Sequence, residues 1–189
     1  MSYHRMIALG FALGVSLPLK APAQMPGMGG SARPVSLVIS GGLTLPSGEL
    51  GDLHDSGFHY DVSLLLNLPG FPIAIRPEFS LTQMKLKEPA GTPTADSDVT
   101  KLMALMGNIE LPVAGGLYLL AGGGLLSLDL AGADASSSKF AFDAGAGFRF
   151  ALGGIRGFVE ARVGAASYEQ GKFGFSKAQF IPVTFGVVF

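Results

Sequence analysis

Apolar and polar side chains alternate along most of the chain from residue 35 onward. In segment 35–45, for example, Val35, Leu37 and Ile39 share one face, while Ser36 and Ser40 lie on the other. Successive side chains of a β-strand point to opposite faces, so this alternation predicts strands. Eight such segments follow one another, at 35–45, 58–68, 73–82, 99–111, 117–128, 140–150, 155–163 and 180–189. The facing of 99–111 and 117–128 stays open, because leucines such as Leu119 and Leu120 are adjacent.

The connections between these segments alternate in length. Short turns are expected at 69–70, 112–116 and 152–154, and long polar segments at 46–57, 86–98, 129–139 and 166–177. Bacterial outer-membrane barrels have an even number of strands, short periplasmic turns and long outer loops. A soluble Greek-key sandwich has no reason to sort its connections in this way. The pattern predicts an all-β fold, an eight-stranded antiparallel up-and-down transmembrane β-barrel.

The last predicted strand is strongly apolar on one face. Ile181, Val183, Phe185, Val187 and Phe189 alternate with smaller and more mixed residues, and Phe189 ends the chain. Such a face suits contact with lipid, and an apolar strand left free in water would promote aggregation. Pairing of this strand with 35–45 would close the barrel and remove both free edges.

The first residues resemble an export signal. Arg5 precedes the apolar stretch 6–19, and Ala21 and Ala23 form the small-residue pattern of a cleavage site. The expected organisation is a signal peptide at 1–23, a flexible leader at 24–34 and an outer-membrane barrel domain at 35–189. The protein is therefore expected to be exported through a cleaved signal peptide.

Composition narrows the class of protein further. The chain has no cysteine, which excludes a disulfide scaffold and thiol chemistry, and its net charge of −1 argues against nucleic-acid binding. Hydrophobic residues make up 48% of the chain and the mean hydropathy is +0.43. No run of about 18 apolar residues follows the signal, which argues against a transmembrane helix. A high mean hydropathy without a long apolar segment is again typical of strands, in which apolar and polar residues alternate.

Nine charged residues lie in the middle of predicted strands, opposite apolar neighbours. They are Asp61, Arg76, Glu78, Glu110, Asp143, Arg149, Arg156, Glu160 and Arg162. Arginine on a lipid face costs roughly 2–4 kcal/mol at the membrane midplane, so these side chains are expected to face inward and pair. Side chains can fill the interior of an eight-stranded barrel. The set therefore predicts a balanced internal plug and a lumen without an open channel.

Catalytic and metal-binding alternatives are weaker. Interleaved arginines would keep the carboxylates ionised, which disfavours acid–base catalysis, and no Ser/His/Asp set is suggested. Glu49, Asp52, His54 and Asp55 form the best metal candidate, but their spacing matches neither a calcium loop nor a zinc motif. We therefore expect a solvated acidic loop, no enzyme activity, no cofactor and no metal.

Aromatic residues indicate weak girdles at the two ends of the barrel. Phe58, Tyr60, Phe140 and Phe142 would lie near the long loops, and Tyr118, Phe148, Phe150 and Phe189 near the short turns. The segment 131–138, rich in Ala and Ser, is interpreted as a flexible loop.

Three segments resemble known proteins. Residues 40–52, 55–59 and 75–79 resemble the opening hairpins of small outer-membrane β-barrel proteins of the OmpA, OmpX and OmpW type. The resemblance covers roughly 35–189 and implies the same fold and location. It also implies that Phe185, Val187 and Phe189 form an assembly signal for the barrel-insertion machinery. That signal usually has glycine five residues before the last aromatic residue, whereas this chain has Thr184 there and glycine at Gly186.

The favoured function is structural, a surface-exposed monomeric barrel with four extracellular loops and a filled lumen. The expected partners are outer-membrane lipid and the assembly machinery. The alternative, from the OmpW resemblance, is a narrow conduit for small hydrophobic molecules, which needs an apolar lumen or an opening between strands. A third possibility, a soluble lipocalin-like barrel, needs a polar outer face that 58–68, 140–150 and 180–189 do not provide.

Overall fold

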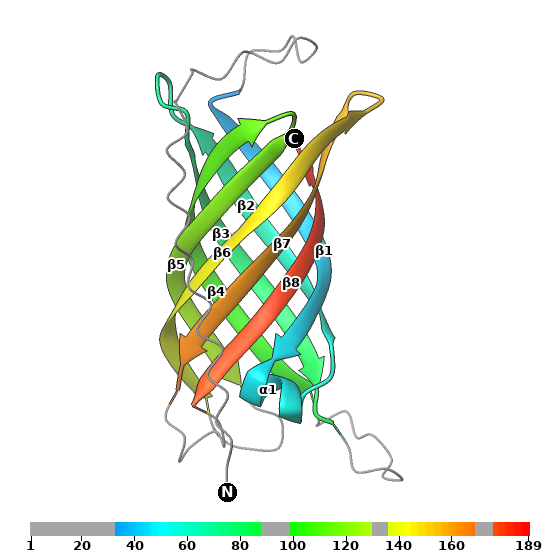
Figure 1. The fold of residues 1–189 in the computed structure, drawn as a ribbon, viewed down its shortest axis with the longest axis vertical. Coiled ribbons are helices and arrows are strands. Elements are labelled where there is room, and N and C mark those ends of the chain that lie inside the picture. Colours follow the sequence, from blue (N-terminus) through cyan, green and yellow to red (C-terminus); the bar gives the residue numbers. More distant parts are fainter. Residues whose placement is uncertain (1–32, 88–98, 130–135, 169–175) are drawn as a thin grey trace, which may run out of the picture.

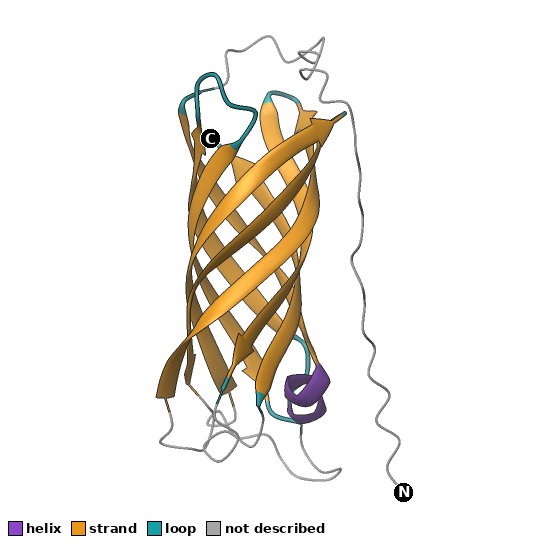
Figure 2. Ribbon diagram, turned by 60° about the vertical axis from the view of Figure 1, so that its left-hand side comes forward, coloured by secondary structure: helices purple, strands orange, loops and turns teal. Residues whose placement is uncertain are grey.

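The computed structural model describes residues 33–87, 99–129, 136–168 and 176–189, and these form a closed β-barrel (Figures 1 and 2). Its elements are β1 (Val35–Ser47), α1 (Gly48–Leu53), β2 (Gly57–Asn67), β3 (Ala74–Lys85), β4 (Val99–Ala114), β5 (Leu117–Asp129), β6 (Ser136–Leu152), β7 (Ile155–Ser167) and β8 (Lys177–Val188). The predictions for the signal peptide at 1–23 and for most of the leader at 24–34 lie outside the described residues, as do 88–98, 130–135 and 169–175.

Every strand pairs with its neighbours in the sequence, and all pairs are antiparallel. β1 and β8 close the barrel in a ladder that runs from Val38 opposite Val188 to Ser47 opposite Gln179. The ladder leaves neither terminal strand with an open edge, which is the main hazard of an isolated sheet. The predicted fold class and up-and-down order are confirmed.

The two ends of the barrel differ in their connections (Figure 1). At the turn end, where the C-terminus lies, β5 and β7 each begin directly after a Gly-Gly pair. Gly115 and Gly116 have φ values of 58° and 93°, and Gly153 and Gly154 have 56° and 88°. Two successive positive φ values are the signature of type I′ turns, which match the twist of paired strands. At the opposite end, here called the loop end, β1 and β2 are joined through α1.

The strands extend farther toward the loop end than the alternation predicts, and two loop predictions are wrong in part. The acidic loop at 49–55 was expected to be solvated, and Glu49, Asp52 and Asp55 are indeed exposed, but residues 48–53 form α1 and His54 is 1% exposed. Residues 136–138 of the expected flexible loop belong to β6. Both segments are polar, and polarity alone predicts a loop. It does not reveal that the backbone of 136–138 continues the strand pairing, or that 48–53 form a helix.

The structure resolves the facing of β4 and β5. On β4, Leu102 and Met106 are buried inside the barrel, whereas Leu105 is 61% exposed on the outer wall. On β5, Leu120 is buried and Leu119 is exposed. Leucine therefore occurs on both faces, because the lumen near each end is itself apolar. For this reason alternation could not show which residues of these two strands face inward.

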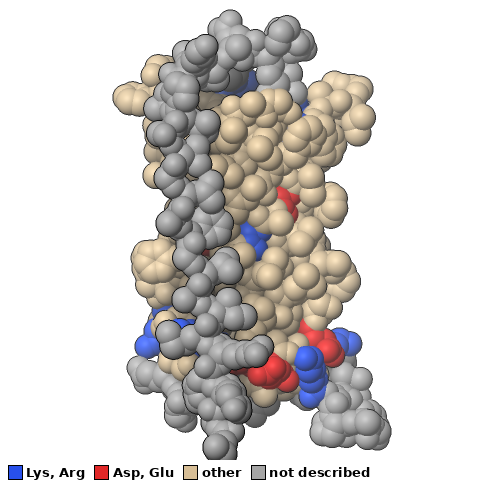
Figure 3. Space-filling view, in the orientation of Figure 1, with Lys and Arg blue, Asp and Glu red and all other residues tan. Residues whose placement is uncertain are grey.

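The outer wall is apolar over most of its height. Exposed side chains include Leu105, Phe142 and Phe185, each at least 60% exposed. On the face drawn in Figure 3, uncharged residues cover most of the described surface, and charged ones gather mainly at the end that carries α1. Among the described residues, no helix has the length and apolarity needed to cross a membrane.

One predicted girdle residue is misplaced. Tyr118 was expected on the outer wall near the short turns, but it points into the lumen and is 1% exposed. Phe148 and Phe189 do lie on the outside, at 44% and 54% exposure. Tyr118 comes second in its strand, where the alternation of β5 had not been resolved.

The buried side chains inside the barrel form three layers. An apolar cluster at the loop end includes Leu102, Leu126 and Leu128, together with Leu50 of α1. A second apolar cluster at the turn end includes Leu65, Leu120 and Phe158. The charged residues lie between these two clusters.

Candidate functional site in the barrel interior

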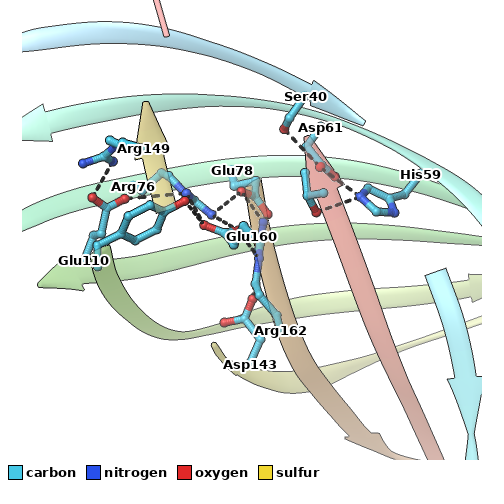
Figure 4. Close-up of polar contacts among 12 residues, drawn as sticks. Ser40, His59, Asp61, Arg76, Glu78, Glu110, Asp143, Arg149, Glu160 and Arg162 are labelled. Carbon is cyan, nitrogen blue, oxygen red and sulfur yellow. Dashed lines mark hydrogen bonds and ion pairs between the residues drawn. The ribbon is translucent and has the colours of Figure 1, made fainter. Parts of the chain in front are cut away.

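A connected set of charged side chains crosses the lumen between the two apolar clusters (Figure 4). We call it the ionic layer and define it as Arg76, Glu78, Glu110, Asp143, Arg149, Glu160 and Arg162, together with Tyr118. Its members come from β3, β4, β5, β6 and β7, so it joins strands that are not neighbours in the wall.

Glu160 is the centre of the ionic layer. Arg76 donates two hydrogen bonds to its two carboxylate oxygens, of 2.8 Å and 2.7 Å, in the bidentate arrangement that suits a guanidinium group. Arg162 Nε donates a third bond of 2.6 Å, and the Tyr118 hydroxyl a fourth of 2.7 Å. Glu160 is 1% exposed, so its charge is compensated entirely by these neighbours.

Arg162 extends the layer toward β3 and β6. Its terminal nitrogens donate bonds of 2.6 Å and 2.9 Å to the carboxylate of Glu78, and one of them donates a 2.9 Å bond to Asp143. Any side chain at position 145 would crowd Arg162, because a Cβ on Gly145 would lie 2.9 Å from Arg162 Cγ. Gly145 therefore leaves the room in which Arg162 reaches across the lumen.

The layer ends near the short turns in a second pair. Glu110, which is fully buried, forms an ion pair with Arg149 and lies 3.6 Å from Arg76 Nη1. The guanidinium carbon of Arg149 lies 4.5 Å from the centre of the Tyr118 ring, a cation–π contact. Gly147 makes this possible, because a Cβ there would lie 2.2 Å from Tyr118 Cζ.

Seven of the nine predicted lumen charges belong to this layer, and two do not. Asp61 accepts a 3.2 Å bond from Ser40, and Arg156 donates a 3.3 Å bond to Ser36. Asp61 and Arg156 therefore both contact serine hydroxyls of β1, and Arg156 is the second residue of β7, at the turn end.

Asp61 instead belongs to a polar cluster around His59. The two ring nitrogens of His59 each lie 2.9 Å from a threonine hydroxyl, Nδ1 from Thr44 and Nε2 from Thr184. Asp61 lies 3.6 Å from the same Nε2. At 3.6 Å Asp61 is beyond hydrogen-bond distance of the ring, so the two threonine hydroxyls orient His59.

A small cavity separates the ionic layer from the loop-end apolar cluster. Its volume is about 40 Å³, and Asp61, Glu78 and Arg162 line one side while Met106 and Leu126 line the other. A single water needs roughly 10–15 Å³ of such space, so the cavity suits a few waters and no larger solute.

At the loop end, α1 and the residues around it are joined by several hydrogen bonds. His54 Nε2 lies 2.8 Å from the Thr100 hydroxyl, and the His54 backbone N–H donates to Leu50 O at 3.0 Å. Glu49 accepts bonds from the backbone N–H groups of Ser176 and Lys177, which ties α1 to the start of β8. Lys87 donates to Gly51 O. These contacts form what we call the cap.

Two groups of the cap have shifted acidities. Hydrogen bonds from Ser176 N–H and Lys177 N–H lower the pKa of Glu49 below its usual 4.5. Burial lowers the pKa of His54 below 6.5. Both shifts favour the deprotonated form in the folded cap, so both make the cap weaker in acid. Among the described residues, no three His, Asp or Glu side chains are arranged to hold a metal ion, including those of the segment 49–55.

The residues of the predicted assembly signal lie at the turn end of β8. Phe185 is 60% exposed on the outer wall, and Val187 is partly exposed on the same face. Phe189 follows the strand, and its N–H donates to Leu37 O at 2.8 Å. The last residue is therefore held by β1.

Comparison with known proteins supports the fold. No family model matches the chain, and no curated protein matches its sequence. Among solved structures, Neisserial surface protein A has a TM-score of 0.55 at 15% identity, covering 84% of this chain and 98% of that one. The Yersinia pestis outer-membrane protein Ail, in a phospholipid nanodisc, also has a TM-score of 0.55, at 14% identity, covering 83% and 100%. The chain has the fold of the small outer-membrane β-barrels.

Within this small-barrel fold, several residues of the interior could not be named from the sequence. Tyr118 contacts Glu160, His59 lies 3.6 Å from Asp61, and Thr184 contacts His59. The period-2 pattern offered one signal, since His59 and Thr184 lie on the inward faces of their strands together with Asp61 and Gly186. Tyr118 gave no such signal.

We expect Glu160→Gln to destabilise the barrel by about 3–5 kcal/mol, the usual cost of removing one partner of a buried pair. The neutral amide would leave Arg76 and Arg162 without the charge they share. Urea unfolding in detergent, followed by heat-modifiable gel migration, measures the change. The exposed Asp52→Asn is the control and should stay within about 0.5 kcal/mol of the unmodified protein. Equal stability of the two variants would contradict the central place of Glu160.

Acid should loosen the cap before it affects the barrel. The folded cap binds fewer protons than the open one, so its stability is complete above about pH 6.5 and falls as the pH drops toward the lowered pKa of His54. Hydrogen-exchange protection of residues 50–54, corrected for intrinsic rates, should decrease from about pH 7.5 to about pH 5. His54→Gln, which cannot be protonated, should show little decrease. An identical decrease in both proteins would exclude His54 as the cause.

Proposed function

We propose that this protein is a structural barrel of the bacterial outer membrane that displays its loop end at the cell surface. The apolar outer wall would face lipid, and the short Gly-Gly turns would face the periplasm. The observation that carries the proposal is the ionic layer, whose buried ion pairs lie between two apolar clusters.

A filled lumen fits display better than transport. The two arginines, Arg76 and Arg162, each bind carboxylates from other strands, so neither is free to guide a solute. The cavity beside them is too small for a nutrient or an ion with its hydration shell. No catalytic role is proposed for His59, whose two ring nitrogens both contact threonine hydroxyls.

A narrow conduit for small hydrophobic molecules is the second candidate. The apolar lining of the loop-end half of the lumen favours it, since Leu102, Leu126 and Leu128 would accept an apolar solute. Such a solute would meet the ionic layer below and would have to leave through the wall. Strand pairing around the barrel is closed, and α1 covers the entrance, so this route needs two openings that display does not need.

Export and assembly follow from the same proposal. The barrel-insertion machinery would recognise the C-terminal strand through Phe185, Val187 and Phe189, which lie on its outward side or at its end. Lipid is the proposed partner of the outer wall. Because the strand ladder is closed by β1 and β8, no edge is left for a second subunit, which favours a monomer.

Single cysteines test the orientation, because the natural chain has none. Asp52→Cys places a thiol on exposed α1, and Phe71→Cys places one at the turn end, where Phe71 is 67% exposed. A membrane-impermeant maleimide should label Asp52→Cys in intact cells. It should label Phe71→Cys only after the outer membrane is permeabilised.

The two variants control for each other in expression and thiol reactivity. Both should label fully in detergent, and both should keep heat-modifiable migration. Labelling of Phe71→Cys but not Asp52→Cys in intact cells would reverse the orientation. Absence of both variants from the outer-membrane fraction would reject the proposed location.

A further inference from the structure

The outer wall has an apolar groove centred on Gly41. Leu43, Phe58, Tyr60, Val183 and Phe185 line it, and its volume is about 230 Å³. β1 lies between β2 and β8 in the barrel wall (Figure 1), and residues of all three strands line the groove. The groove exists because Gly41 occupies an outward position of β1 where Ile39 and Leu43 on either side project a side chain.

The register places two aromatic rings on either side of this glycine. Gly41 is directly opposite Tyr60 on β2 and directly opposite Phe185 on β8. Both rings project strongly, with exposures of 65% and 60%. Neighbouring strands lie about 4.8 Å apart, so β2 and β8 are separated by roughly 10 Å across β1.

The separation suits one hydrocarbon chain. Two contacts of about 3.5–4.0 Å need roughly 7–8 Å, which is less than the roughly 10 Å between the backbones of β2 and β8. The volume is below the roughly 300–1,000 Å³ of sites that enclose a whole drug-sized ligand. The groove therefore fits a segment of a longer apolar molecule that continues beyond it.

The surroundings identify the source of that molecule. The exposed lining is almost entirely apolar and carries no charged side chain that would bind a phosphate. It is also continuous with the exposed apolar wall, where Ile39, Val62 and Leu64 are each more than 40% exposed. If this wall faces lipid, as in the proposed function on which this inference rests, an acyl chain is the molecule at hand.

We propose that the Gly41 groove retains one acyl chain of a membrane lipid, more tightly than the rest of the wall holds its lipids. A second copy of the protein is a poorer occupant. Two such walls facing each other would bring projecting Tyr60 and Phe185 rings together, whereas a slender chain enters between them.

Gly41→Val provides the test, because its side chain would fill the groove. Even a Cβ at this position would lie 3.4 Å from Tyr60 Cδ1 and 3.0 Å from His59 O. Gly107→Val is the matched control, an outward glycine in β4 whose Cβ would meet only Gly123 O, at 3.8 Å. Both variants add the same side chain to the outer wall.

Each protein is reconstituted in vesicles of phosphatidylethanolamine and phosphatidylglycerol, extracted in mild detergent and examined by native mass spectrometry. The unmodified protein and Gly107→Val should retain one phospholipid per barrel. Gly41→Val should reduce the retained fraction about tenfold. Equal retention by all three proteins, or none by the unmodified protein, would overturn the proposal. If the spectra show a dimer of the unmodified protein and of Gly107→Val but not of Gly41→Val, the occupant of the groove is a second copy of the protein, not a lipid.

Tyr60→Ala keeps the test decisive if Gly41→Val does not fold, as judged by heat-modifiable migration. It removes one side of the groove without crowding the backbone and should also lose the retained lipid. Failure of this proposal would leave the cysteine labelling of Asp52→Cys and Phe71→Cys unchanged, so it is distinguishable from failure of the proposed orientation.

Discussion

Charge inside a closed and narrow barrel must be compensated by other protein groups, and this constraint organises the molecule. An unpaired ion in such a place costs several kcal/mol, so each guanidinium needs carboxylates within reach. Arg76 and Arg162 meet this need by sharing Glu160, and Arg162 also binds Glu78. These bonds cross the lumen and join β3 directly to β7. In the wall, these two strands are connected only through the strands between them.

The rest of the interior adapts to this layer. Small inward residues in β6, Gly145 and Gly147, leave space for Arg162 and Tyr118, which are too large to fit beside ordinary side chains. Apolar side chains fill the lumen on both sides of the layer, and the surrounding low polarity strengthens the ion pairs. The cap lies at the loop end, and its Leu50 belongs to the apolar cluster there.

The outer architecture was predictable from the sequence, whereas the internal pairing was only partly so. Alternation and connection lengths gave the strand order, because both depend on local sequence. The inward position of charges such as Glu160 followed from the cost of exposing them on an apolar wall. Their partners depend on register and tilt, which bring Arg76 to Glu160 across 84 positions and leave Arg156 beside Ser36. Tyr118 and α1 were missed for a similar reason, since each is placed by what lies across the lumen or over its mouth.

A closed lumen is the central claim, because display through the loops and the absence of transport both rest on it. Electrical recording from the purified barrel in a planar lipid bilayer tests it most directly, with insertion verified by protease protection in vesicles of the same lipid. The packed layers predict no stable open conductance over long recordings. Replacing Arg76, Glu160 and Arg162 together by alanine should produce measurable current if the variant stays folded. Reproducible conductance steps from the unmodified protein would contradict the closed lumen.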